Sequence, residues 1–111
     1  MKKFILKQEE IKQLIPAKGS CIASDKITVE GMKVGYMYRE VPNNEYDSGW
    51  RIFSGNEDEE YTNNSANFEI YDLNTICNYD NSIIPYLDYP QGSCLERNGN
   101  AFITVKNETK N

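Results

Sequence analysis

The dipeptide Asn98-Gly99 lies between two apolar segments, Cys94–Arg97 and Ala101–Val105. Asn and Gly tolerate the positive φ that a type I′ turn requires, so this pattern predicts an antiparallel β-hairpin. Four other segments contain alternating apolar residues that are typical of short strands. They cover residues 26–29, 34–39, 50–53 and 68–71. Glu30-Gly31 can form a tight turn between the first two, which predicts a second hairpin.

Helical patterns are fewer. The i, i+3, i+4 spacing of three apolar residues predicts a helix over residues 8–15, formed around Ile11, Leu14 and Ile15. Asp72 stands where an N-cap belongs, directly before a helical stripe of Leu73, Ile76 and Cys77. Ser54 and Glu57 have capping-box spacing and precede further carboxylates, which favours a third short helix over residues 56–63.

These elements predict one small α+β domain, made of a mainly antiparallel sheet of about five or six short strands with two or three short helices. Turn-forming residues make 41–49 a surface loop, and Pro85 makes 83–87 irregular. We expect residues 1–19 to be a helical extension, residues 20–106 the domain, and residues 107–111 a frayed tail.

Composition excludes several kinds of active site. The chain has no histidine, which removes Ser-His-Asp and Cys-His catalysis and mixed Cys/His zinc sites. The formal net charge of −5 argues against a nucleic-acid partner, because phosphate contacts need lysine and arginine. No motif indicates a cofactor or a metal site, and we expect the protein not to be an enzyme.

The three cysteines and the first ten residues indicate the compartment. Cys21, Cys77 and Cys94 form an odd set without a C-x-x-C pair, which favours three small buried thiols in a reducing cell interior. The apolar run Phe4–Leu6 has three residues, whereas a secretory signal needs roughly 7–15 and a membrane span about 20. We therefore expect a cytoplasmic protein without a membrane partner.

The acidic residues are concentrated in one part of the chain. Residues 40–88 contain eleven carboxylates and a single basic residue, Arg51, for a charge of −10, whereas the segments on either side are net positive. This acidic block is either a solvated face or a docking face for a basic protein, with aromatic anchors such as Tyr46 and Trp50. A calcium loop is disfavoured because the EF-hand pattern is missing. Trp50 is either such an anchor or a core residue.

Three segments of the chain together resemble a known family. They are Ser24–Gly31 continuing to Val34–Glu40, then Asp47–Gly55 with Glu57-Asp58, and Tyr71–Ile76. The most distinctive is Asp-Ser-Gly-Trp-Arg-x-Phe-Ser-Gly at Asp47–Gly55. Their order and spacing resemble the DUF2185 family, also called the Imm33 immunity protein family, over about residues 20–105.

The resemblance implies a bacterial immunity protein that binds and blocks a cognate toxin of a polymorphic toxin system. It implies no catalytic residues. For the partner-binding surface we select Tyr46, Asp47, Trp50, Arg51, Glu57, Asp58 and Asp72. The alternative is a small ligand-binding or regulatory domain with a pocket at Trp50–Gly55. The sequence leaves the identity of the toxin and the oligomeric state open.

Overall fold

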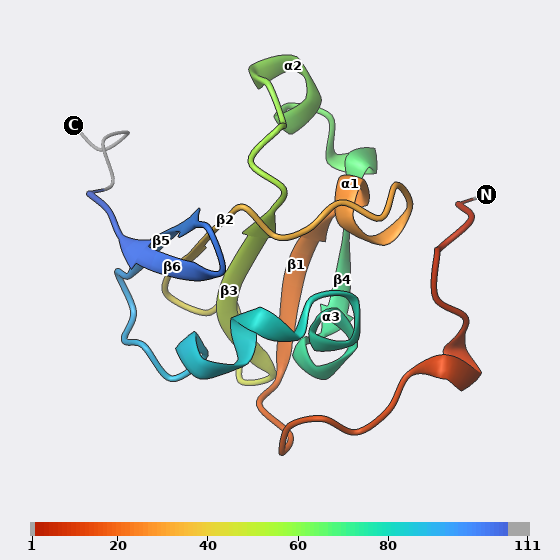
Figure 1. Ribbon diagram of the computed structural model, residues 1–111, viewed down its shortest axis with the longest axis horizontal. Coiled ribbons are helices and arrows are strands. Elements are labelled where there is room, and N and C mark those ends of the chain that lie inside the picture. Colours follow the sequence, from red (N-terminus) through yellow and green to blue (C-terminus); the bar gives the residue numbers. More distant parts are fainter. Residues whose placement is uncertain (1, 107–111) are drawn as a thin grey trace.

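The computed structural model describes residues 2–106, which form one six-stranded sheet with short helices (Figure 1). The strands are β1 (Ser20–Ser24), β2 (Tyr36–Arg39), β3 (Asp47–Phe53), β4 (Phe68–Asp72), β5 (Cys94–Asn98) and β6 (Ala101–Thr104). They lie in the order β4-β1-β3-β2-β5-β6. All neighbours pair antiparallel except β1 and β3, which pair parallel. The predicted α+β class and the mainly antiparallel sheet are confirmed.

The helices are short. Three are α-helical: α1 (Asp25–Thr28), α2 (Glu59–Thr62) and α3 (Leu73–Tyr79). Three are 3-10 turns: η1 (Gln8–Glu10), η2 (Ser65–Asn67) and η3 (Asn81–Tyr86). Asp72 caps α3 as predicted, since its side chain accepts a hydrogen bond from the backbone N–H of Asn74. Within residues 2–106, no helix has the length and apolar character needed to cross a membrane.

The predicted hairpin over residues 26–38 is wrong. Residues 25–28 form α1, because the Ser24 hydroxyl caps the backbone N–H of Lys26 and the helix buries Ile27 and Thr28. Burial against the core therefore outweighs the strand preference of this β-branched segment. The real neighbours of β2 are β3 and β5. The predicted hairpin at Asn98-Gly99 is confirmed, with Gly99 at φ +68° between β5 and β6.

The predicted helix over residues 8–15 is reduced to the single turn η1. From Ile11 to the start of β1 the chain forms no helix, and Asn74 Oδ1 accepts the backbone N–H groups of Leu14 and Ile15. Side chains of α3 thus satisfy amides that a longer helix would have satisfied internally. The acidic helix is also shorter than predicted, and β3 begins at Asp47, inside the predicted loop. The expected tail, residues 107–111, lies outside the described residues.

The core lies between one face of the sheet and the pair α3 and η3. Strand residues of this core are Ala23, Met37, Trp50, Ile52 and Leu95, and Figure 1 shows α3 in front of β1 and β4. All three cysteines are buried and free, as predicted. Burial raises the pKa of the Cys21 and Cys77 thiols, the latter to about 11, so both stay protonated at neutral pH.

Candidate functional site

The sheet face opposite α3 and η3, which we call the open face, is only partly covered. Strand alternation places every second residue on it, and the register aligns Ile22 with Ile70 across β1 and β4. Ile70 is 72 % exposed. Exposed apolar surface on a folded domain is characteristic of a binding site when it is contiguous. The apolar members of this face are Ile22, Tyr36, Tyr38, Phe53, Phe68 and Ile70.

Aromatic rings form a continuous strip across the open face. Phe53 lies at its centre, stacked on Tyr38 with a centroid distance of 5.9 Å and in contact with Tyr36 at 6.0 Å. On its other side Phe68 meets Phe53 edge-on at 5.7 Å, and Tyr61 of α2 meets Phe68 at 5.8 Å. We call these five residues the aromatic strip. The offset and edge-on contacts hold the rings in place before any partner binds.

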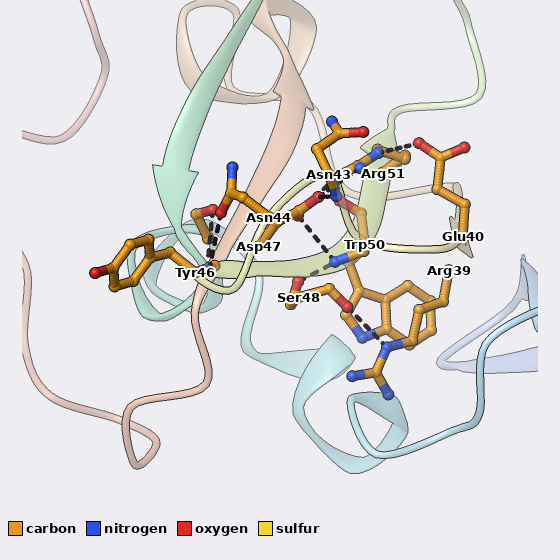
Figure 2. Close-up of polar contacts among 11 residues, drawn as sticks. Arg39, Glu40, Asn43, Asn44, Tyr46, Asp47, Ser48, Trp50 and Arg51 are labelled. Carbon is orange, nitrogen blue, oxygen red and sulfur yellow. Dashed lines mark hydrogen bonds and ion pairs between the residues drawn. The ribbon is translucent and has the colours of Figure 1, made fainter.

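Arg51 joins two carboxylates beneath one end of the open face (Figure 2). Its Nη2 lies 2.8 Å from Asp47 Oδ2, and its Nε lies 2.5 Å from Glu40 Oε2. The side chains of Arg51 and Asp47 are 4 % and 6 % exposed. The hydrogen bond from Arg51 holds the pKa of Asp47 far below its usual range, and Asp47 in turn raises the pKa of Arg51. Arg51 is therefore paired internally.

The same Asp47 carboxylate organises the loop before β3. It accepts hydrogen bonds from the backbone N–H groups of Asn43 at 2.8 Å and Gly49 at 2.9 Å. Asn44 Oδ1 accepts the N–H of Tyr46, whose own carbonyl accepts the N–H of Ser20. Figure 2 shows the Tyr46 ring directed away from this network, and the residue is 73 % exposed. The loop thus presents an aromatic side chain from a fixed backbone.

A groove of about 590 Å³ lies beside Tyr46, at the edge of the sheet. Ile70 and the carboxylates of Glu45 and Asp72 line it, together with Lys18. Tyr46 and Asp72, both selected from the sequence, therefore lie at one site although they are separated along the chain. Asp72 has a second role there, because its carboxylate also caps α3.

Glu57 and Asp58 lie at the opposite end of β3. Burial disfavours the charged form of Glu57, but hydrogen bonds from Ser24 and Ser54 outweigh it and lower the pKa of Glu57. Its carboxylate accepts the Ser54 N–H and hydroxyl at 2.9 Å and the Gly55 N–H at 3.0 Å. Asp58 is exposed and caps α2 through the N–H of Tyr61.

Trp50 is not part of this surface, which corrects its selection as a partner-binding residue. It is fully buried on the core face of β3, and its Nε1 donates to the carbonyl of Leu87 at 3.1 Å. Strand alternation explains this, because Arg51 and Phe53 point to the open face and Trp50 and Ile52 point away from it. The carboxylate of Asp47 and the guanidinium of Arg51 are likewise buried and position the loop from beneath.

The hollow expected at Trp50–Gly55 is present in altered form. Phe53 and Gly55, but not Trp50, line a hollow of about 330 Å³. Glu57, which was selected from the sequence, also lines it, whereas Tyr36 and Glu96 were missed. The alternation of Tyr36 and Tyr38 around Met37 indicates that the two tyrosines share a face. Glu96 joins them only through the pairing of β2 with β5, which no local pattern reveals.

Comparison with protein families gives one match. The model of the Imm33 family, described as "Immunity protein Imm33 domain", matches residues 21–106. Comparison with curated proteins gives no match, and comparison with solved structures gives none either. The matched segment begins one residue into β1 and contains the other five strands and all apolar members of the open face named above. The chain therefore belongs to the Imm33 immunity protein family.

Proposed function

We propose that this protein is a cytoplasmic, non-enzymatic immunity protein that neutralises a cognate toxin domain by binding it directly through the open face. The observation that carries the proposal is a partly covered sheet face with a preformed aromatic strip and an exposed Ile70, in a member of an immunity family. Aromatic side chains in a fixed arrangement provide large contact area at low entropic cost, as binding hot spots require.

The rim of this face is acidic, which favours a basic toxin domain. Exposed carboxylates stand near both ends of β3, in the 41–46 loop, at the end of β4 and on β5, namely Glu40, Glu45, Asp58, Asp72 and Glu96. The aromatic strip would contribute affinity, and the surrounding charge would speed encounter and select a cationic partner. Of the residues selected from the sequence, Tyr46, Glu57, Asp58 and Asp72 remain on this surface.

Co-expression tests the proposal directly. A candidate toxin domain, sought among the neighbouring genes, is expressed with and without the protein, and growth and complex formation on gel filtration are measured. We expect rescue of growth and co-elution for the native protein. Ile70→Asp should abolish both, because it places a charge among the exposed apolar residues of the open face. Ile5→Asp is the matched control, since Ile5 is exposed on the N-terminal segment.

Failure of the native protein to rescue growth and to form a complex would refute immunity against that toxin. Equal loss for Ile70→Asp and Ile5→Asp would instead refute the open face as the interface. Circular dichroism of both variants confirms that each is folded before binding is compared.

Two further exposed carboxylates, on α2 beside the aromatic strip, allow a separate test of the acidic charge around the open face. Glu59 and Glu60 are exposed on α2, in its first turn, and neither caps the helix, so Glu59→Lys and Glu60→Lys change charge without removing a cap. We expect weaker toxin binding at low salt and a smaller difference at high salt, because exposed charges are screened. Unchanged affinity at low salt would exclude a contribution of α2 to docking.

A further inference from the structure

We propose that the hollow lined by Tyr36, Phe53, Glu57 and Glu96 receives a cationic side chain of the toxin, for which arginine fits best. We call it the cation pocket. This inference rests on the proposed function and specifies one contact within it. Its occupant is a side chain of the protein partner rather than a free metabolite.

Three adjacent strands build the pocket. The register of β5, β2 and β3 aligns Glu96 with Tyr36 and Tyr36 with Phe53, so the three side chains lie side by side on the open face. The hollow has a volume of about 330 Å³. Two glycines shape its wall: a Cβ on Gly35 would lie 2.0 Å from the carbonyl oxygen of Ser54, and Gly55 adopts φ +91°. The backbones of β2 and β3 can therefore approach closely beside the rings.

The pocket contains two carboxylates, those of Glu57 and Glu96. Among the residues that the structure describes, neither Glu57 nor Glu96 takes part in an ion pair. Glu57 is fixed by Ser54 and Gly55, so its carboxylate is already oriented. Burial, together with the neighbouring Cys94, raises the pKa of Tyr36 to about 12, which keeps the phenol neutral. The lining thus combines an uncharged aromatic ring with two carboxylates.

This combination selects a cation. An apolar group would desolvate both carboxylates without replacing their hydrogen bonds, and an anion would be repelled by them. A guanidinium can stack on Tyr36 or Phe53 and donate to both carboxylates, because it is planar and carries five N–H groups. The far end of the aromatic strip already holds such a contact, with Lys26 Nζ 4.8 Å from the centroid of the Tyr61 ring.

A titration with a minimal probe tests the pocket without the toxin. Ethylguanidinium chloride is added to the isotopically labelled full-length protein, with sodium chloride at equal ionic strength as the reference, and amide shifts are followed by NMR. We expect saturable shifts at Tyr36, Gly55 and Glu96 that sodium chloride does not produce. Glu96→Gln should weaken them severalfold, while Glu30→Gln, an exposed carboxylate outside the pocket, should leave them unchanged. Identical shifts with both salts would overturn the proposal.

The toxin complex tests the occupant. Glu96→Gln and Tyr36→Leu should each raise the Kd for the toxin domain by about tenfold, which is typical of a lost charge-assisted contact, whereas Glu30→Gln should not. Changing the responsible toxin arginine to Gln should remove the sensitivity to Glu96→Gln, as a double-mutant cycle requires. Because Glu96 is exposed, its variant folds even if Tyr36→Leu does not.

The two proposals fail in different ways. An unchanged Kd for both pocket variants, in a complex that does form, overturns the cation pocket and leaves the immunity function standing. An unchanged Kd would overturn the cation pocket even if ethylguanidinium binds to the isolated protein. A native protein that does not bind the toxin overturns the function, and with it the toxin as the source of the cation.

Discussion

Arg51 is the single basic residue between residues 40 and 88, and it forms ion pairs with Glu40 and Asp47. A buried guanidinium is tolerated only when a counter-charge neutralises it and its N–H groups are hydrogen-bonded. Asp47 provides the charge and accepts hydrogen bonds from Arg51 through both carboxylate oxygens. The same carboxylate holds the backbone at Asn43 and Gly49. One ion pair thus couples the stability of β3 to the position of the loop that presents Tyr46.

Replacing Asp47 by Asn should destabilise the protein strongly at neutral pH. Removing one partner of a buried ion pair costs about 3–5 kcal/mol. Because the pKa of Asp47 is lowered in the folded state, its contribution is complete above the pKa of about 3.9 in the unfolded chain and is lost as the pH falls below it. Urea unfolding should therefore show a gap between native and Asp47→Asn protein at pH 7 that narrows below pH 4.

Asp88→Asn is the matched control for that experiment. Asp88 also forms an ion pair, with Lys18, but its side chain is 85 % exposed, so its removal should change the unfolding midpoint little. A gap for Asp47→Asn that stays constant through the acid range would contradict the assignment.

Gly49 shows why the distinctive segment needs a glycine. It adopts φ +90° inside β3, and a Cβ there would lie 2.3 Å from the carbonyl oxygen of Glu40. Gly49→Ala should therefore cost more than the 1–2 kcal/mol or so of the left-handed conformation alone. Gly92→Ala provides that reference, since Gly92 has φ +94° and nothing within 4 Å of its would-be Cβ. Equal losses in thermal or urea unfolding would show that the contact with Glu40 is unimportant.

At the scale of elements, α3 combines a structural cap with a surface charge. Asp72 caps the helix and also lines the groove beside Tyr46. Asp72→Asn keeps a capping side chain but removes the charge, whereas Asp72→Ala removes both. We expect Asp72→Asn to leave stability nearly unchanged and Asp72→Ala to cost about 1 kcal/mol, measured by urea unfolding. If both variants weaken toxin binding equally at low salt, the charge of Asp72 contacts the partner. Unchanged toxin binding by Asp72→Asn would show that this charge is not part of the interface.

Helices, strands and turns were predictable from the sequence where neighbouring residues determine their conformation. The turn at Asn98-Gly99, the cap at Asp72 and the alternation in β2 and β4 each depend on neighbouring residues, and all are present. Residues 26–29 were assigned wrongly because their conformation depends on burial of Ile27 in the core. The non-helical segment before Ile15 depends on Asn74, which is about 60 residues away in the chain. Side-chain partners of this kind leave no pattern in the sequence around the segment they hold.

The candidate site was predictable only in part for the same reason. Charge counting found the acidic block, and Tyr46 and Asp72 lie together as members of one groove. The sequence pattern could not assign Trp50 to a face of the sheet, because a lone aromatic residue in a strand suits the core as well as the surface. Glu96 was missed because it lies outside the block and reaches Tyr36 only through the pairing of β2 with β5.

At the scale of the whole molecule, we propose that exposed carboxylates of the acidic block, together with Glu96, form a rim around the aromatic strip of the open face. Long-range attraction by such a rim accelerates association with a basic partner and is screened by salt. The association rate constant for the toxin domain should therefore fall as ionic strength rises, while the dissociation rate changes less. Surface plasmon resonance at several salt concentrations measures both. A salt-independent association rate would show that the rim does not steer the partner.

The parallel pairing of β1 with β3 has a consequence for biosynthesis. β1 is made first but lies between β3 and β4, so one of its two edges stays unpaired until β4, which ends at residue 72, has emerged from the ribosome. The open face is completed later still, when β5 adds Glu96 beside Tyr36. Nascent chains that end before β5 therefore lack part of the surface that we propose for binding. Protection of the producing cell would depend on finished molecules being present before the toxin is made.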